Sequence, residues 1–400
     1  MEMKSAHILS GTYAYLAHQL PDTFSAVFDS DVFSFFPGFC DVHVHFREPG
    51  FSYKETIRTG SLAAAHGGYT AVCTMPNLQP VPDSLDNLQI QQDIIDADAV
   101  IPVYPYGAIT CEEKGKQLVD MSVLAPHVIA FSDDGHGVQS EDMMRKAMCA
   151  AKQLGKIIAA HCEVDALVHG GYIHDGTYAR QHHHKGISSE SEYAEVERDI
   201  RLAEETGCAF HICHISTKES VDAVRRAKQR GVDVTCETAP HYLVLDDSDL
   251  QEDGRFKMNP PLRDAVDREA LIQGIRDGTV DMIATDHAPH TQSEKANGLA
   301  KSPFGITGLE TAFPVLYTCL VRTGTIPLET LINLLAVNPR KRFAIPFNGY
   351  SVWNLNEQRK IDSDEFLSMG KSTPFDGMEV YGCNYMTVAS SAVVYRRNII

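Results

Sequence analysis

The sequence has no long apolar run, no paired-cysteine motif and little positive charge. No stretch of 18 consecutive apolar residues occurs in the 400-residue chain, so we expect no membrane-spanning helix. The N-terminus lacks a basic region followed by an apolar core, so we expect no secretory signal. The ten cysteines form no CxxC pair, and several lie in apolar runs, which is typical of reduced core residues in a cytoplasmic protein.

The net charge of the chain indicates which partners are disfavoured, and its length indicates the kind of fold. A formal net charge of -18 argues against binding to nucleic acid or to anionic membranes. An acidic surface mostly confers solubility, so it says little about the substrate. With 44% hydrophobic residues, the 400-residue chain suits a large α/β barrel with a small additional module.

From residue 37 onward, short apolar runs rich in β-branched residues alternate with longer segments of helical periodicity. Eight such runs occur, at 38–46, 69–75, 100–109, 128–131, 156–160, 209–215, 232–236 and 280–285. Predicted helices between them include 53–66, 141–154, 190–206, 218–230 and 264–277, and several end at a glycine, as helix C-termini often do. Eight strand–helix units predict an α/β fold, a (β/α)8 TIM-like barrel.

The segments outside this repeat have a different pattern. Two further helices are predicted at 305–323 and 328–337, and short alternating runs follow at 351–355, 377–381 and 385–388. These runs predict a small β module, which the N-terminal segment would complete. We therefore expect three parts: an N-terminal segment at 1–36 that belongs to the β module, a metal-dependent barrel at 37–345, and a C-terminal β module at 346–400.

The first apolar run contains an HxH pair, His43 and His45. Side chains alternate between the two faces of a strand, so both histidines point the same way, and two imidazoles on one face are half of a metal site. An isolated HxH pair is weak support for metal binding. The later runs strengthen the interpretation, because a reactive residue follows nearly every one of them: Asn77, Asp133, Asp134, His161, His214, Glu237, His241, Asp286, His287 and His290.

Active sites of (β/α)8 barrels lie at the C-terminal ends of the strands, where these residues would meet. Mixed imidazole and carboxylate ligation suits Zn²⁺, although Mn, Co or Ni could substitute. We expect a two-metal site with these ligands: His43, His45, Asp134, His161, His214 and Asp286. Two ions about 3.5–4 Å apart would activate a water molecule for attack on a carbonyl. Asp286 would take the proton and pass it to a leaving nitrogen.

Two other groups of histidines are interpreted differently. His211 lies three residues before His214, so it would face the other side of the strand and have a structural role. The run 182–184 consists of three histidines that resemble a metal-binding tract. In a loop it is more often a solvated segment, so we leave it out of the site.

The chain resembles the bacterial type I dihydroorotases of the amidohydrolase superfamily, between residue 37 and about residue 375. The motifs that carry the resemblance are Pro37-Gly38-Phe39, His43-Val44-His45-Phe46-Arg47-Glu48-Pro49-Gly50, Tyr53-Lys54-Glu55-Thr56, Gly67-Gly68-Tyr69-Thr70, Met75-Pro76-Asn77, Ser132-Asp133-Asp134-Gly135, Ala160-His161-Cys162-Glu163, Cys213-His214-Ile215-Ser216-Thr217-Lys218-Glu219, Lys257-Met258-Asn259-Pro260-Pro261-Leu262-Arg263, Thr285-Asp286-His287-Ala288-Pro289-His290, Pro303-Phe304-Gly305 and Gly308-Leu309-Glu310-Thr311.

This resemblance implies reversible ring closure of N-carbamoyl-L-aspartate to (S)-dihydroorotate, a step of pyrimidine biosynthesis. It implies the same six metal ligands, with Asp134 bridging two ions, one or two Zn²⁺ per subunit, and Asp286 as the acid/base. The substrate-binding residues that it implies are Arg47, Asn77 and His290 for the carboxylate, Asn259 for the pyrimidine ring, and Phe304 and Gly305 for a backbone contact.

Some of these roles also agree with the residues themselves. Arg47 lies two residues beyond His45, on the same face, and a guanidinium fork fits a carboxylate. The segment 290–302 is rich in polar and small residues and would form a functional loop over the metals, although an ordinary connection between strand and helix is the alternative.

Two alternative functions remain. Hydantoinases and dihydropyrimidinases bridge their metals with a carboxylated lysine, but the run 128–134 contains no lysine, which argues against a hydantoinase or an allantoinase. An inactive paralogue that scaffolds aspartate carbamoyltransferase would have lost metal ligands, and this chain keeps all of them. We expect a cytoplasmic enzyme, a homodimer that could also associate with that transferase.

Overall fold

Eight parallel strand runs follow one another along the chain in the computed structural model, which describes residues 32–397. They are β2 (Phe39–Val44), β3 (Tyr69–Thr74), β4 (Val103–Pro105) continued by β5 (Gly107–Ala108), β6 (Phe131–Ser132), β7 (Ile158–Ala160), β10 (Phe210–Ile212), β11 (Val234–Thr238) and β12 (Met282–Ile283). The predicted run 100–109 is therefore two short strands, separated at Tyr106. The amide of Tyr106 donates to the carbonyl of Thr74, the last residue of β3.

Hydrogen bonds between neighbouring runs arrange these strands around a closed ring. One set of pairs follows the order β2-β3-β4, and a second follows β12-β11-β10-β7-β6-β5. The ring closes between the first and last runs, because Val44 forms a parallel bridge with His287 and the amide of His45 donates to the carbonyl of His287 at 2.8 Å. The predicted (β/α)8 barrel is confirmed.

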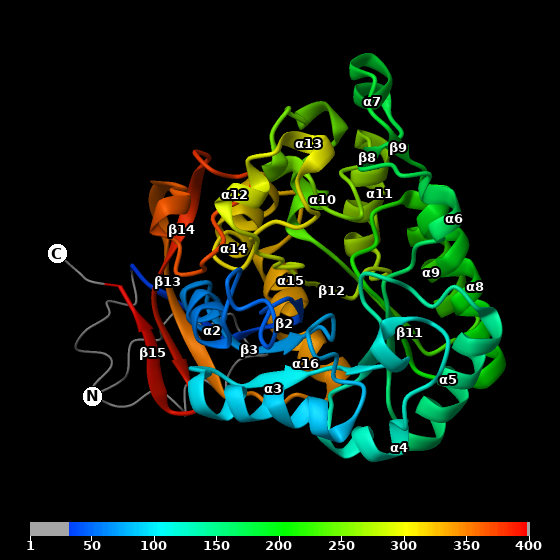
Figure 1. Cartoon of the computed structure of the whole chain (residues 1–400). Coiled ribbons are helices and arrows are strands. Elements are labelled where there is room, and N and C mark those ends of the chain that lie inside the picture. The colour runs from blue at the N-terminus through cyan, green and yellow to red at the C-terminus, as the bar shows by residue number, and fades with distance from the viewer. Residues whose placement is uncertain (1–31, 398–400) are drawn as a thin grey trace.

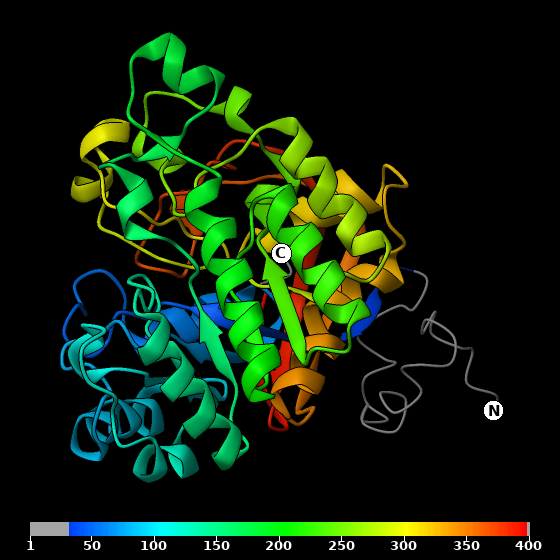
Figure 2. The same ribbon diagram turned by 90° about the vertical axis from the view of Figure 1, so that its right-hand side faces the viewer.

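Long helices cover the outside of the barrel, as Figures 1 and 2 show. They are α2 (Ile57–His66), α3 (Leu85–Asp98), α5 (Glu141–Leu154), α8 (Glu190–Thr206), α9 (Lys218–Gln229) and α11 (Ala265–Arg276). Gly155 and Gly207 end α5 and α8 in the left-handed conformation, with φ of 65° and 66°, as expected for helix C-termini. The prediction 53–66 starts too early, because Thr56 caps α2 in a capping box with Thr59.

Shorter elements occupy the connections. They are α4 (Met121–Leu124), α6 (Asp165–Val168), β8 (Ile173–His174), α7 (Thr177–His182), β9 (Gly186–Ile187), α10 (Pro240–Val244), α12 (Gln292–Lys295), α13 (Gly298–Lys301), α14 (Ala312–Leu316), α15 (Leu328–Ile332) and α16 (Asn338–Phe343). The predicted helix 305–323 is shorter than expected, since it begins at Ala312 and continues past Leu316 in a wider, π-type turn.

A four-stranded antiparallel sheet lies beside the barrel, drawn partly in red and orange in Figure 1. Its order is β1 (Ser34–Pro37), β13 (Gly349–Lys360), β14 (Glu379–Ala389) and β15 (Ala392–Arg396). The short runs predicted at 377–381 and 385–388 form one strand, β14. Most of the N-terminal segment, residues 1–31, lies outside the described residues, and the division at residues 36 and 345 stays a prediction.

The core has two parts that follow from the two faces of the barrel strands. Small and apolar side chains fill the barrel interior, among them Cys40, Val42 and Ala71. A larger cluster fills the layer between strands and helices and includes Trp353 of the small sheet, whose ring lies 4.3 Å from that of Phe313. All ten cysteines are free thiols, and within residues 32–397 no helix is long and apolar enough to cross a membrane.

Candidate metal centre

The predicted metal ligands of the first strand lie at the centre of a buried cluster. His43 is fully buried in β2, and His45, directly after the strand, is 5% exposed. The Nε2 atoms of both rings face the same two carboxylates. His43 Nε2 lies 3.4 Å from Asp134 Oδ1 and 3.6 Å from Asp286 Oδ1, and His45 Nε2 lies 3.4 Å from Asp134 Oδ2 and 3.1 Å from Asp286 Oδ1.

These carboxylates come from opposite sides of the barrel. Asp134 follows β6, and Asp286 follows β12, where its backbone takes a φ of 49°. A positive φ is rare for a residue other than glycine and is tolerated where the surrounding structure enforces it. At this position, three residues after the strand, the chain turns and the side chain of Asp286 meets His43 and His45.

The remaining two predicted ligands join the cluster from the other half of the barrel. His161 follows β7 and His214 follows β10, and their Nδ1 and Nε2 atoms lie 3.1 Å apart. His214 Nε2 also lies 3.7 Å from Asp134 Oδ1. The six predicted ligands therefore converge, although the sequence separates the first from the last by more than half of the chain.

The donor atoms of this cluster fit a bound cation. Two triads have ligand atoms within 4.8 Å of one another: His43 with His45 and Asp286, and His43 with Asp134 and His214. Within residues 32–397, four ring or carboxylate atoms of these six residues are buried without a hydrogen-bond partner: His43 Nε2, Asp134 Oδ1, His161 Nε2 and His214 Nδ1. Buried polar atoms normally have partners, so these unpartnered atoms fit the ligand shell of a positive ion.

The pKa values of the clustered side chains also fit a bound cation. Burial alone would raise the pKa of Asp134, but the charge of His43 and the nearby ring of His214 hold it well below its ordinary value. Burial likewise would lower the pKa of His43, whereas Asp134 raises it well above its ordinary value. Protons therefore compensate the carboxylates when no cation does, and a bound metal would displace them.

A second layer of residues orients the two histidines of β2. The Oε1 atom of Glu237, in β11, accepts a hydrogen bond from His43 Nδ1 at 2.8 Å, and Asn77 Oδ1 lies 2.9 Å from His45 Nδ1. Burial would raise the pKa of Glu237, but hydrogen bonds from His211 and His43 lower it to about 2. Sequence reasoning placed Glu237 at a strand end without giving it a role.

The histidines that the sequence predicts to have no part in the site lie outside the cluster. His211 is fully buried and places Nε2 3.1 Å from Glu237 Oε2, so it contacts the residue that orients His43. In the run 182–184, His184 Nε2 lies 2.6 Å from Glu252 Oε1, and the ring of His182 stacks on Tyr178. Neither His211 nor the run belongs to the His/Asp groups found within the described residues.

A cationic group lies beside the cluster, after β2 and β12. Arg47 donates from Nε to the carbonyl of Pro289 at 3.3 Å. His290 lies 3.2 Å from Lys54 Nζ through Nδ1 and 2.7 Å from the carbonyl of Phe304 through Nε2. Nδ1 therefore accepts from Lys54 and Nε2 carries the proton. Burial, followed by the charges of Arg47 and Lys54, lowers the pKa of His290 to about 3, so the ring is neutral at pH 7.

The other predicted substrate-binding residues lie near either the histidine cluster or this cationic group. Asn259 Nδ2 donates to Glu163 Oε2 at 3.0 Å, and the same oxygen lies 3.7 Å from His161 Nε2. Phe304 is 36% exposed. The amide of Gly305 donates to the carbonyl of Lys257 at 3.1 Å, so this backbone group is already engaged inside the protein.

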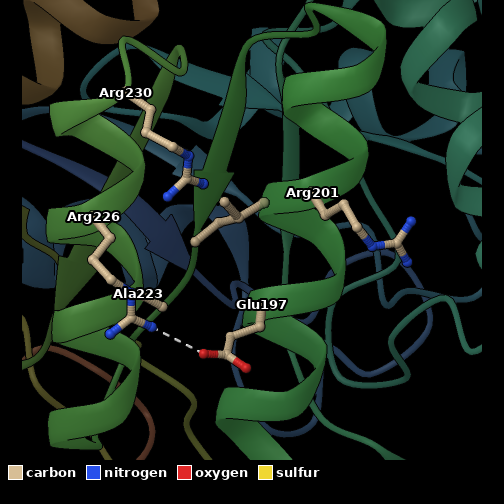
Figure 3. Close-up of a pocket in the computed structure, with 6 residues that line it drawn as sticks. Glu197, Arg201, Ala223, Arg226 and Arg230 are labelled. Carbon is tan, nitrogen blue, oxygen red and sulfur yellow. Dashed lines mark hydrogen bonds and ion pairs between the residues drawn. The ribbon is translucent and has the colours of Figure 1, made fainter.

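A cavity of about 200 Å³ lies elsewhere, between the outer helices α8 and α9 (Figure 3). Three arginines line it, but each has a carboxylate partner: Arg226 pairs with Glu197 at 3.0 Å, Arg230 with Glu204, and Arg201 with Glu141 and Glu205. The charges in this cavity are therefore compensated, and it carries no chemistry comparable to that of the histidine cluster.

Solved structures support the architecture. The fold is similar to that of L-hydantoinase (dihydropyrimidinase) from Arthrobacter aurescens, with a TM-score of 0.81 and 23% identity over 92% of this chain and 86% of the hydantoinase chain. Dihydropyrimidinase from Brevibacillus agri gives a TM-score of 0.79 at 21% identity, over 91% of this chain and 85% of that enzyme. At these identities the similarity concerns the fold alone.

Sequence comparisons are more specific. A family model described as dihydro-orotase-like matches residues 34–220. Dihydroorotase from Fusobacterium nucleatum is 50% identical over 90% of this chain and 86% of its own length, and dihydroorotase from Bacillus cytotoxicus is 45% identical over 98% and 94%. Identity of this extent covers both the barrel and the small sheet, and the chain belongs to the dihydroorotase family.

Proposed function

We propose that the protein is a dihydroorotase, a metal-dependent cyclic amide hydrolase that interconverts (S)-dihydroorotate and N-carbamoyl-L-aspartate. The observation that carries the proposal is the convergence of four histidines and two aspartates at one end of the barrel, next to a cationic group suited to a carboxylate. The identity of 45–50% to dihydroorotases supports the choice of substrate within the large class of cyclic amidohydrolases.

We assign the metal site to His43, His45, Asp134, His161, His214 and Asp286, with one or two Zn²⁺ ions per subunit. This mixed set of imidazole and carboxylate ligands suits zinc. When bound, the metal would polarise the amide carbonyl and lower the pKa of a water molecule to about 7. Glu237 and Asn77 would keep the Nε2 atoms of His43 and His45 directed at the metal, because each accepts the proton on Nδ1.

Asp286 would be the acid/base of the reaction. Burial would raise its pKa, but the ring of His45, 3.1 Å away, and the charge of His43 hold it below its ordinary value. The carboxylate is therefore ionised at neutral pH and able to accept a proton from the attacking water. It would then deliver that proton to the amide nitrogen that leaves when the ring opens.

Arg47, Asn77 and His290 would hold the substrate carboxylate. The bond from Arg47 Nε to the carbonyl of Pro289 orients the guanidinium beside His290. His290 is neutral and donates its single N–H, on Nε2, to the carbonyl of Phe304, so it would donate to a carboxylate oxygen when the substrate replaces that carbonyl as the acceptor. Asn259 would contact the pyrimidine ring, and Phe304 and Gly305 would provide a backbone contact to the substrate.

An assay of dihydroorotate hydrolysis tests this function. The loss of ultraviolet absorbance would be followed before and after removal of metal by a chelator, and again after Zn²⁺ is added back, with hydantoin and dihydrouracil as control substrates. We expect activity on dihydroorotate alone, lost with the metal and restored with zinc. Hydrolysis of hydantoin at a comparable rate would contradict the proposal and favour a hydantoinase.

The alternative of a hydantoinase or allantoinase is less well supported, because Asp134 stands at the end of the fourth strand, where a carboxylated lysine bridge would be needed. The alternative of an inactive scaffold is disfavoured by the complete ligand set. We also propose a cytoplasmic homodimer that could associate with aspartate carbamoyltransferase. Light scattering of the protein alone and mixed with the transferase tests both forms of assembly.

A further inference from the structure

Lys295 is a buried lysine in the connection that follows β12. It is the last residue of the short helix α12 and is 5% exposed. Its ammonium group donates to three backbone carbonyls: Lys257 at 3.0 Å, Pro303 at 3.0 Å and Gly305 at 2.7 Å. A lysine ammonium has three donors, so these three acceptors satisfy the group completely.

The acceptors of Lys295 are neutral carbonyls rather than carboxylates, which makes the burial of its charge unfavourable. Burial, and then the nearby charge of Lys257, lowers the pKa of Lys295 to about 7. A buried charge is retained in a protein only where its hydrogen bonds are well made. The contact is therefore a specific tie between three chain segments.

These segments are the ones that border the candidate site. Gly305 donates its amide to the carbonyl of Lys257, so Lys295 and Gly305 share one acceptor. The carbonyl of Phe304 contacts His290 Nε2 at 2.7 Å. Asn259 lies two residues after Lys257 and reaches Glu163 beside His161. Lys295 thus joins the segment that carries Asn259 to the segment that carries Phe304.

The helix that carries Lys295 does not depend on this contact for its own formation. Thr291 caps α12 in a capping box with Glu294, and the Oγ atom of Ser302 donates to the carbonyl of Lys295 at 3.0 Å. Figure 1 draws α12 and α13 in yellow. The ammonium group is therefore not needed to form α12 and is available for the contact with residues 257, 303 and 305.

We propose that Lys295 is a positioning residue for substrate binding. It holds the segment at Lys257 and Asn259 and the segment at Phe304 and Gly305 at a constant separation across the mouth of the site. Lys295 itself stays behind the backbone and touches neither substrate nor metal. This inference rests on the proposed dihydroorotase function.

The test compares steady-state kinetics of wild type, Lys295→Met and Lys301→Met. Methionine keeps the length of the side chain and removes its charge and donors. Lys301 belongs to α13 of the same connection and is exposed, so Lys301→Met is a matched control. We expect KM for dihydroorotate to rise about tenfold in Lys295→Met, with kcat and bound metal close to wild type. Lys301→Met should leave all three values unchanged.

An unchanged KM in Lys295→Met, or an equal rise in both variants, would overturn the inference. A fall in kcat together with loss of metal would also overturn it, because the defect would then concern the metal centre. Should Lys295→Met fail to fold, Lys295→Gln, which keeps a donor without the charge, provides the same comparison. Wild-type protein that binds metal but does not hydrolyse dihydroorotate would instead refute the proposed function.

Discussion

At the scale of single residues, the candidate site is a set of pairs in which one member holds the other in place. Glu237 holds His43, and Asn77 contacts His45 at the ring nitrogen opposite the metal site. Outer partners of this kind fix the tautomer and the orientation of a ligating histidine. Residues that never touch the metal should therefore affect how tightly it binds.

Glu237→Leu tests this expectation. The substitution removes the acceptor of His43 Nδ1 from a fully buried position, so the ring can place its proton on Nε2 and lose its ligating lone pair. We expect metal affinity, measured by competition with a chelator, to fall about 10- to 100-fold. Glu237→Gln should have a smaller effect, because its carbonyl can still accept from His43. Wild-type affinity in the leucine variant would contradict this role.

Asp286→Asn tests the acid/base assignment. The amide cannot accept the proton of the attacking water, so we expect turnover to fall by about 10²–10⁴ or more, while at least one metal ion stays bound. Asp281, at the other end of the same strand, pairs with Lys228 at 2.6 Å, and Asp281→Asn is the matched control. Comparable turnover in the two variants would show that Asp286 has no special part in the reaction.

At the scale of elements, close packing between α2 and β2 positions the histidines. Gly60 of α2 faces the buried ring of Phe46, which lies two residues after β2. A Cβ atom at Gly60 would lie 2.5 Å from Phe46 Cδ1, closer than packed atoms allow. The absence of a side chain at this position therefore lets the helix approach the segment that carries His45 and Arg47.

Gly60→Ala should consequently destabilise the protein, even though alanine favours helix formation. Overpacking against Phe46 should lower the free energy of unfolding by about 1–3 kcal/mol. The higher helix propensity of alanine should offset about 1 kcal/mol of that loss. Urea unfolding followed by circular dichroism measures the change. Arg58→Ala, at an exposed position of the same helix, should shift stability by no more than about 0.5 kcal/mol. A stabilised Gly60→Ala variant would refute the packing argument.

At the scale of the whole molecule, buried ionisable groups make stability depend on pH. His174, in β8, is 8% exposed and lies 3.3 Å from Arg263 Nη1 through Nδ1. Burial and the charge of Arg263 lower its pKa to about 4. The folded protein therefore keeps His174 neutral at pH values where the unfolded chain protonates it.

This difference predicts loss of stability in acid. An unfolded histidine titrates near pH 6.5, so between about pH 6.5 and 4 the unfolded state binds more protons, and the free energy of unfolding falls as pH decreases. At pH 4 the free energy of unfolding is lower than at neutral pH by on the order of 3 kcal/mol because of His174. In His174→Gln, unfolding curves should depend less on pH across this window than in wild type. Identical pH dependence in the two proteins would contradict the assignment.

The sequence is sufficient to predict the barrel and the convergence of the six candidate ligands, because both follow from local patterns. Apolar runs with helical segments between them specify alternating strands and helices, and polar residues after those runs meet at one end of a parallel barrel. The HxH pair and the residues Asp134, His161, His214 and Asp286 belong to such patterns. The boundaries were less accurate, since capping by Thr56 and the break at Tyr106 depend on single side-chain and backbone contacts.

Only the three-dimensional structure shows which residues, distant in sequence, support the candidate metal site. Glu237 lies 194 positions from His43, and Lys295 lies 38 positions from Lys257, so no local periodicity connects them. Closure of the barrel through Val44 and His287 brings such residues together. Local patterns determine which residues lie at the C-terminal end of a strand. The contacts across the barrel depend on how all eight strands pair to form the closed barrel.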